Sequence, residues 1–287
     1  MEFYLTALML GLCLSAMGLG IFISMKIFNI PDITTDGSYT LGAVITAILL
    51  TAHWNAAAVI PVVLVSGAIA GISTGLIHTR LKIDALLAGI LVMTGLYSIN
   101  LTILGRSNVP LLDVADLFSG LKIFATPVYN NLTIGIIFIG IITLIVGYVL
   151  RTDFGIAMRA TGNSASMTRA LGINNNKMKI IGLAIANSLT ALSGYLVAQY
   201  QSFTDINMGI GIVITGLGSV LIGEAMIKWW NIGSIVWQLA VIICGSILFQ
   251  MVLAFTLSIG VDPNMLKLVT ASFVLLIVII PRLKKND

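Results

Sequence analysis

Residues 131–150, NLTIGIIFIGIITLIVGYVL, form a run of 20 residues without a charged side chain. A bilayer core about 30 Å thick needs roughly 20 apolar helical residues per crossing, so this run predicts a transmembrane helix. The same character extends over the whole chain: of its 287 residues, 58% are hydrophobic and 9% are charged. Soluble domains carry about 25% charged residues, because polar groups must cover their surface. The sequence therefore predicts an all-α polytopic membrane protein and excludes a soluble globular domain.

Eight further apolar runs predict additional crossings, which gives about nine transmembrane helices, within a range of eight to ten. Two of these runs, 38–52 and 208–226, are short and interrupted by glycine. Cys13 and Cys244 lie in apolar runs and are expected to be small buried hydrophobic residues. With two separated histidines, they provide no metal-ligand cluster. The other expected spans are 3–25, 56–77, 85–104, 180–200, 231–255 and 265–281.

The basic residues predict the orientation of these spans. The loop 151–179 holds Arg151, Arg159, Arg169, Lys177 and Lys179, and cytoplasmic loops are enriched in Lys and Arg. With this loop inside, alternation places twelve of the 15 basic residues in the cytoplasm. The N-terminus is then outside and the C-terminus inside. This topology accounts for the net charge of +4 without a nucleic-acid-binding surface. The three basic residues left outside are Arg106, Lys122 and Lys267.

A short polar segment precedes a glycine-containing apolar run in each half of the chain. The first is IPDITTDG at residues 30–37, and the second is FTDINMG at residues 203–209. The first follows an out-to-in span and the second an in-to-out span, which is the pattern of inverted-repeat transporters. The chain is therefore expected to be a single transmembrane domain. Its parts are a first half at about 1–130, a linker span at 131–150, the cytoplasmic loop 151–179 and a second half at 180–287.

The segment 30–38 is the most polar stretch near membrane depth. Each of its carboxylates would cost about 2.5–3.5 kcal/mol at a lipid-exposed helix centre, so they must face protein or water. Two hypotheses remain open. In one, the segment is an ordinary cytoplasmic turn in which Asp36 or Ser38 caps the next helix; in the other, it is unwound and lines a transport pathway. The pathway hypothesis names Asp32, Thr34, Asp36, Asn100 and Asp205, although a plain loop is favoured around Asp205.

Residues 67–75, GAIAGISTG, contain two overlapping GxxxG units. Gly67, Gly71 and Gly75 share one helix face and would let two helix backbones approach closely. The last five residues also match the hydrolase pattern GxSxG, which requires a strand–turn–helix elbow. Ser73 lies inside a predicted membrane helix, so helix packing is favoured over a catalytic serine. No catalytic set is expected, and no GxxxxGK[ST] loop is present to bind ATP.

The loop 151–179 is expected to contain a short helix. Asn163 or Ser164 suits the N-cap, residues 164–171 suit two helical turns, and Gly172 suits the C-terminal stop. Met167, Ala170 and Leu171 would then share one apolar face, with Arg159 and Arg169 flanking it. This pattern favours docking into another protein. The alternative is a helix packed on its own membrane domain.

This loop resembles the coupling helix of ABC-importer permeases of the branched-chain amino acid and ribose type. Their pattern is roughly R-A-x-G-x-N-x-x-x-A-x-x-x-G-I-N. This chain matches it, except that the alanine and the spacing are not matched rigidly. The segments PDITTDGS at 31–38, GLIHTRLKID at 75–84 and LYSINL at 96–101 resemble a permease subfamily linked to tryptophan, tyrosine and related compounds. The resemblance covers nearly the whole chain. The loop positions that carry it are Arg159, Ala160, Gly162, Ala170, Gly172, Ile173 and Asn174.

The resemblance implies a permease subunit in the bacterial plasma (inner) membrane that transports a small solute, such as an amino acid or an aromatic amino-acid-like compound. Its implied partners are a second copy of itself, two cytoplasmic ATPases that use ATP, an extracellular solute-binding lipoprotein and membrane lipid. The chain itself would bind no cofactor and no nucleic acid. The residues expected to couple to the ATPase are Arg159, Gly162, Asn163, Met167, Arg169, Ala170, Leu171, Gly172, Ile173 and Asn174, and Glu224 is a further candidate for this surface.

An ion-coupled secondary transporter with inverted repeats is the alternative function. Such carriers need ionisable groups inside the membrane. Beyond Asp32, Asp36 and Glu224, the expected spans carry almost none. The sequence therefore favours the ABC permease.

Overall fold

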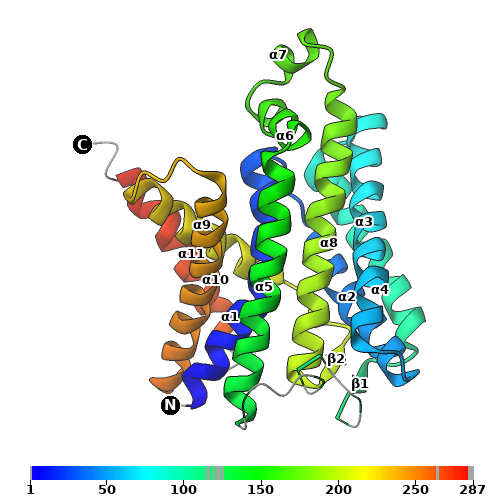
Figure 1. Cartoon of the computed structure of the whole chain (residues 1–287), viewed down its shortest axis with the longest axis vertical. Helices are drawn as coiled ribbons and strands as arrows, with labels where there is room; N and C mark the ends of the chain where they lie inside the picture. The colour runs from blue at the N-terminus through cyan, green and yellow to red at the C-terminus, as the bar shows by residue number, and fades with distance from the viewer. Residues whose placement is uncertain are drawn as a thin grey trace.

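The computed structural model of the chain describes residues 2–112, 114, 117, 118, 120, 124, 126–262 and 265–283. Three basic residues counted in the orientation argument, Lys122, Lys284 and Lys285, therefore lie outside the described residues. The described part is a bundle of helices with one small sheet (Figure 1). The elements are α1 (Glu2–Ile21), the π-helix η1 (Phe22–Ile27), α2 (Thr34–Thr51), α3 (Ala56–Arg80), α4 (Ala85–Leu104), β1 (Asn108–Pro110), α5 (Pro127–Arg151), α6 (Asp153–Asn163), α7 (Ala165–Ala170), α8 (Asn175–Gln201), β2 (Phe203–Asp205), α9 (Ile212–Trp229), α10 (Ile235–Ser258) and α11 (Leu266–Leu283).

Within the described residues, seven helices are long and apolar enough to cross a membrane: α1 with η1, α3, α4, α5, α8, α9 and α10. The all-α polytopic class is thus confirmed. Each of the nine expected runs contains a helix, although α9 and α10 each begin four residues later than expected, and α2 and α11 do not meet these criteria. The first turn of α2 is polar because it contains Thr34, Thr35 and Asp36, and the fully described part of α11, Leu266–Ile277, is a shorter apolar helix.

A two-stranded antiparallel sheet was not expected from the sequence. β1 pairs with β2 so that Asn108 lies opposite Asp205 and Pro110 opposite Phe203. β1 follows the end of α4, and β2 follows the end of α8. Both strands therefore lie at the same end of the bundle, which we call the β1–β2 end (Figure 1). Backbone groups outside a helix need other hydrogen-bond partners, and pairing the two segments supplies them.

The helices α2 and α9 begin within the bundle and not at its ends (Figure 1). Residues 28–33 lead back into the bundle after η1 without forming a helix, and α2 then runs toward the β1–β2 end (Figure 1). In the second half, β2 and the turn residues 206–211 lead into α9, which runs toward the opposite end (Figure 1). The N-termini of the two helices meet, because Asp36 of α2 accepts hydrogen bonds from the backbone of Gly211 and Val213.

The three glycines of α3 pack against α8. A Cβ atom at Gly67 would come too close to the backbone of Asn187 and Ser188, and a Cβ atom at Gly71 would collide with the carbonyl oxygen of Leu183. Gly75 lies in the same way against Ile180. Only glycine permits this separation of the two backbones. The sequence pattern did not indicate which helix would be the partner.

Lipid-facing and core positions separate clearly between helices. α1 and α8 are mostly buried, whereas α4 and α5 expose many large apolar side chains. Cys13 of α1 is buried, as expected, but the expectation for Cys244 of α10 was wrong, because it is exposed. An apolar run in a membrane protein can face lipid as readily as protein, so hydrophobicity alone does not predict burial there.

Candidate functional site

A buried carboxylate joins the first turns of α2 and α9. The Oδ2 atom of Asp36 accepts a hydrogen bond from the backbone N–H of Gly211 at 2.8 Å, and Oδ1 accepts one from Val213 at 2.9 Å. The first N–H groups of a helix have no partner within that helix, and a helix N-terminus favours negative charge. Asp36 is only 6% exposed. It therefore caps α9 from a neighbouring helix.

A second carboxylate caps α2 itself. The Oδ1 atom of Asp32 accepts from the backbone N–H of Thr34 at 2.9 Å, while Oδ2 accepts from Asn187 Nδ2 at 2.7 Å. The Oδ1 atom of Asn187 in turn accepts from Ser38 Oγ at 2.7 Å. The hypothesis that Asp36 or Ser38 is the N-cap was wrong, because α2 already begins at Thr34 and both residues lie inside it.

Two further hydrogen bonds extend this network to α3 and α4. Thr34 and Thr74 are joined through their hydroxyl oxygens at 2.7 Å, and Asn100 Nδ2 donates to the carbonyl oxygen of Gly37 at 3.2 Å. Side chains from four helices and the N-terminal backbone of α9 thus converge at one place. We call this set the polar junction, and it consists of Asp32, Thr34, Asp36, Ser38, Thr74, Asn100 and Asn187 together with the N–H groups of Gly211 and Val213.

Beside the polar junction lies a cavity of ≈ 20 Å³, whose lining includes Asp36, Tyr97, Asn100 and Gly209. Its volume is enough for about one water molecule. In the described part of the chain, the Oδ1 atom of Asn100 is buried without a hydrogen-bond partner. The polar junction therefore retains one free hydrogen-bond acceptor, Asn100 Oδ1, near a cavity with room for about one water molecule.

The residues expected to line a pathway do not all come together. Asp32, Thr34, Asp36 and Asn100 belong to the polar junction. Asp205 lies in β2 at the β1–β2 end, where its Oδ1 atom accepts from the N–H of Asn207 at 2.7 Å. Sequence reasoning missed Asn187 and Thr74, and it considered Ser38 only as a helix cap. Asn187 could have been found as an amide side chain within the apolar span of α8, because such residues usually hydrogen-bond to a neighbouring helix.

The loop between α5 and α8 contains two helices where the sequence predicted one. α6 follows α5 after a single residue, and Thr152 Oγ1 caps it by accepting from the N–H of Gly155 at 3.4 Å. α7 begins after Ser164, whose Oγ atom accepts from the N–H of Met167 at 3.4 Å. Gly172 follows with φ = +80°, a left-handed conformation that favours glycine. The expected Ser164 cap and Gly172 stop of α7 are confirmed.

α7 protrudes from the bundle (Figure 1), and its large apolar side chains are exposed. Met167 is 64% exposed and Leu171 68%, and Arg169 and Ala170 are exposed as well. The opposite side of the helix is held by the Thr168 hydroxyl, which donates to Asn175 Oδ1 at 2.8 Å. A pocket of ≈ 370 Å³ adjoins α7 and is lined by Arg169, Gly172, Ile173, Asn174, Asn175 and Asn176.

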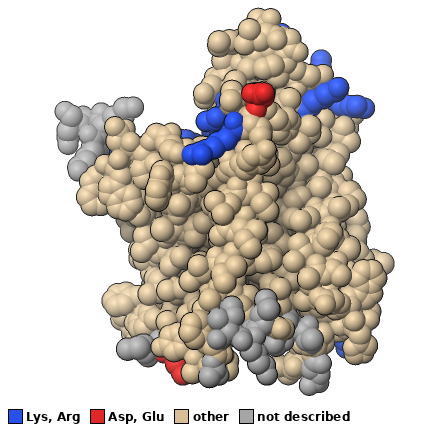
Figure 2. Space-filling model, viewed as in Figure 1, with Lys and Arg blue, Asp and Glu red and all other residues tan. Residues whose placement is uncertain are grey.

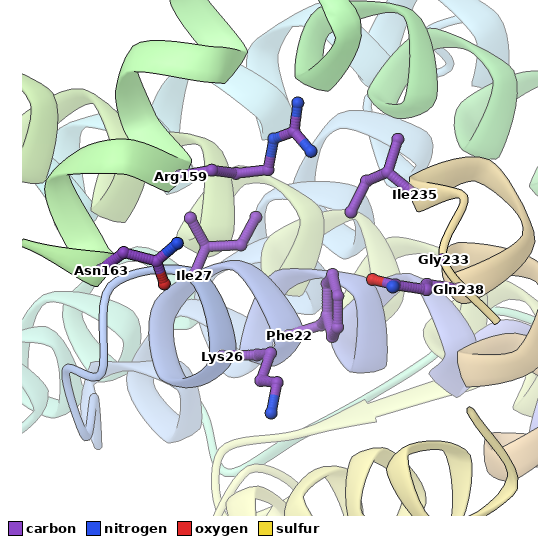
Figure 3. A pocket seen from close by; sticks show the side chains of 8 residues that line it. All are labelled: Phe22, Lys26, Ile27, Arg159, Asn163, Gly233, Ile235 and Gln238. Atoms are coloured by element: carbon purple, nitrogen blue, oxygen red, sulfur yellow. The ribbon is translucent and has the colours of Figure 1, made fainter. Parts of the chain in front are cut away.

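Three residues of the expected coupling set do not belong to this exposed face. A Cβ atom on Gly162 would collide with the carbonyl oxygen of Ile27, and Asn29 Nδ2 donates to the carbonyl oxygen of Gly162 at 3.3 Å. α6 therefore packs on η1. Arg159 and Asn163 line a separate pocket between η1, α6 and the start of α10 (Figure 3). Glu224 is also away from α7, because its Oε2 atom pairs with Lys26 at 3.3 Å.

Basic side chains gather at the end of the molecule from which α6 and α7 protrude, which we call the α7 end (Figure 2). Uncharged surface covers the sides of the bundle (Figure 2). Within the described residues, no group of three or more His, Cys, Asp or Glu side chains could hold a metal ion. The arrangement offers a rigid, hydrogen-bonded interior and an exposed helix at one end.

Comparison with known proteins agrees with this description. The family described as branched-chain amino acid transport system / permease component matches residues 3–280. The chain is 39% identical to a tyrosine transport system permease protein of Clostridioides difficile over 91% of this chain and 85% of the relative. It is 32% identical to an uncharacterized protein of Rickettsia prowazekii over the full length of both. A ribose import permease of Haemophilus influenzae is 28% identical over 67% of this chain and 59% of its own. No solved structure matches the chain.

Proposed function

Because the chain belongs to the permease family of branched-chain amino acid ABC importers, we propose that it forms the translocation path for an amino acid or an aromatic amino-acid-like solute. Permeases of this family are transport subunits of the inner membrane and not enzymes, as the sequence predicted. The tyrosine transport system permease of C. difficile supports the choice of solute, because its similarity extends over 91% of this chain. Membership of this family disfavours the ion-coupled secondary transporter.

We infer nine crossings, with the N-terminus outside and the α7 end in the cytoplasm. The seven long apolar helices support this topology together with α2 and α11. The gathering of basic side chains at the α7 end supports the orientation (Figure 2). The opposite directions of α2 and α9, both of which begin within the bundle, support an inverted repeat around the linker span α5.

The exposed face of α7 is the single observation that supports the division of labour between this chain and an ATPase most directly. A short helix with two large apolar side chains in water is unfavourable unless a partner covers them. We propose that a cytoplasmic ATPase covers Met167, Ala170 and Leu171 and contacts Arg169 and the segment Gly172–Asn174. Arg159, Gly162 and Asn163 would then support α6 behind the contact. Two copies of the permease, two ATPases and an extracellular solute-binding lipoprotein would complete the importer.

The polar junction is proposed as the element that keeps α2 and α9 together while the bundle changes shape. A carboxylate that accepts two backbone N–H groups from another helix joins the two helices in a defined geometry. The free Oδ1 atom of Asn100 and the cavity beside it support the proposal that the polar junction also borders the solute path. Asp205, at the β1–β2 end, would lie where the solute enters.

Leu171→Asp tests the docking proposal. The variant places a carboxylate into the proposed contact, where an unpaired charge is strongly unfavourable. The permease is co-expressed with its ATPase, and we expect at least about a tenfold loss of co-purifying ATPase with unchanged thermal unfolding of the permease. Transport, assayed with labelled tyrosine, should fall in parallel. The stoichiometry of the wild-type complex in the same purification tests the number of permease copies.

The matched control is Leu81→Asp. Leu81 is 66% exposed and lies just after α3 at the α7 end, but it is outside the loop between α5 and α8. It should retain the ATPase. If Leu171→Asp retains a stoichiometric ATPase and transports at the wild-type rate, the docking proposal is wrong.

A further inference from the structure

The pocket that contains Arg159 has a polar side at the α7 end of the molecule. Its volume is ≈ 150 Å³, and it lies between η1, α6 and the start of α10 (Figure 3). Lys26, Arg159, Asn163 and Gln238 supply its polar lining. The Arg159 guanidinium extends from α6 into the space beside Ile235 (Figure 3). The docking face of α7 includes none of these residues.

Arg159 has no acceptor within the described part of the chain. Its Nε atom is buried without a hydrogen-bond partner, and no carboxylate there forms an ion pair with it. A guanidinium has five N–H donors and stays charged at every relevant pH. Partial burial of such a cation is unfavourable unless an acceptor, best of all an anion, takes up its hydrogen bonds. A planar fork of donors is the group that binds phosphate and carboxylate oxygens most effectively.

The charges around the pocket are positive in sum. Lys26 pairs with Glu224 at 3.3 Å, but the same carboxylate oxygen also lies 4.0 Å from Lys228. Arg151 reaches the same region from the end of α5, where its Nη2 atom donates to the uncharged hydroxyl of Ser234 at 3.4 Å. One carboxylate thus faces two lysines, while both arginines lack a carboxylate partner among the described residues. The local field attracts an anion.

Tryptophan side chains mark the depth of this pocket relative to a membrane. Trp229 is 81% exposed, Trp230 55% and Trp237 67%. They flank the turn between α9 and α10 that supplies the Gly233 and Ile235 wall of the pocket. Exposed Trp residues of membrane proteins concentrate at the level of the lipid headgroups. The anion-attracting pocket therefore lies where phosphate groups of the bilayer are most concentrated.

We propose that this pocket binds the phosphate of an anionic phospholipid headgroup from the leaflet at the α7 end. Basic pockets between membrane helices on the cytoplasmic side are suited to such headgroups. The volume is several times that of the cavity beside the polar junction, which has room for about one water molecule, and is enough for a phosphate with a few attached atoms. A carboxylate of the ATPase is disfavoured, because the pocket lies between η1, α6 and the start of α10, whereas α7 protrudes beyond α6 (Figure 1). The proposal rests on membership of a membrane permease family, but not on ATPase docking.

Arg159→Gln tests this proposal with the full-length permease, purified with the ATPase that co-elutes. The protein is titrated with phosphatidylglycerol, with phosphatidylcholine or with inorganic phosphate, and bound lipid is counted by native mass spectrometry. We expect Arg159→Gln to weaken phosphatidylglycerol binding about fivefold, as for the loss of one cation near a membrane surface. Arg80→Gln is the matched control, because Arg80 is an exposed arginine at the same end outside the pocket. It should bind as the wild type does.

Arg159→Lys keeps a cation in the pocket but not the planar fork, so it should bind phosphatidylglycerol more tightly than Arg159→Gln and less tightly than the wild type. Equal losses in Arg159→Gln and Arg80→Gln would overturn the proposal, because general surface charge would then account for the binding. Preference for inorganic phosphate over phosphatidylglycerol would overturn the lipid source. Loss of the ATPase with unchanged lipid binding in Arg159→Gln would assign the pocket to the ATPase contact. Failure of the Leu171→Asp test would leave the lipid result unaffected.

Discussion

The polar junction and α7 reverse the usual relation between polarity and burial. In the polar junction, Asp32 and Asp36 are 4% and 6% exposed, and each carboxylate accepts two hydrogen bonds. In α7, the apolar Met167 and Leu171 are 64% and 68% exposed. Inside a bilayer, backbone N–H groups must find partners within the protein, so buried acceptors stabilise broken helices. Outside it, exposed apolar groups indicate a partner. In the polar junction, buried carboxylates satisfy the N–H groups at the starts of helices. In α7, exposed apolar side chains are left for a partner protein to cover.

The two regions are also held by different kinds of contact. The polar junction depends on α2, α3, α4, α8 and α9 at once, so its stability belongs to the whole bundle. α7 depends on its own cap at Ser164 and on Asn175 at the start of α8. We therefore expect changes around the polar junction to alter the stability of the permease, and changes in α7 to alter the binding of the ATPase alone.

The largest effect is expected for Gly71→Leu, which disrupts the packing of α3 against α8 beside the polar junction. Gly71 lies one turn from Thr74 and packs on Leu183, one turn from Asn187. A side chain there forces α3 and α8 apart, and overpacking costs about 1–3 kcal/mol or more. We expect most of the protein to be lost from the monodisperse fraction in size-exclusion chromatography.

Gly140→Leu is the control for this substitution, because Gly140 of α5 has open space where its side chain would lie. It should behave as the wild type does. Ser73→Ala in the same helix as Gly71 should be nearly harmless, because its hydroxyl only donates to the carbonyl oxygen of Ile69 within α3. A normal elution profile for Gly71→Leu would refute the close packing of α3 on α8.

A smaller but still large effect is expected for Asp36→Ala. The change leaves the half-buried N–H groups of Gly211 and Val213 without their acceptor, and a fully buried group would lose about 1–3 kcal/mol in this way. Thermal unfolding of the purified permease should shift to clearly lower temperature. Asp205→Ala removes a carboxylate that accepts only from Asn207 in its own turn, and it should shift the unfolding much less. Equal shifts would mean that Asp36 does not join α2 to α9.

The smallest effect is expected for Ser164→Ala, which removes the cap of α7. Loss of an N-cap destabilises a helix by about 0.5–2 kcal/mol, and the long 3.4 Å bond to Met167 indicates the lower part of this range. We expect a two- to fivefold weaker ATPase affinity, roughly what such a free energy gives, with unchanged thermal unfolding. Thr152→Ala removes the similar cap of α6 and should leave ATPase binding nearly unchanged. A lower unfolding temperature for Ser164→Ala would contradict the separation of the two regions.

Sequence patterns over a few neighbouring residues predicted the helices and helix caps, which depend on interactions between residues close in the chain. The apolar runs predicted helices in all nine places, and the caps Ser164 and Gly172 predicted the limits of α7. The α6 helix was missed because its sequence, DFGIAMRATGN, contains two glycines and is short and only weakly hydrophobic. The β1–β2 pair was missed because strands of three residues carry almost no periodic signal.

By itself, the sequence determined that this chain is a helical membrane protein with one capped, exposed helix, because hydropathy and capping act over a few neighbouring residues. Only the tertiary structure decided what the polar residues of the interior do. Asp36 lies 175 residues from Gly211, and Asn187 lies 155 residues from Asp32. It also decided that Arg159 points into a pocket beside η1 and not onto the face of α7. Such partners are set by the packing of whole helices, which no spacing along the chain encodes.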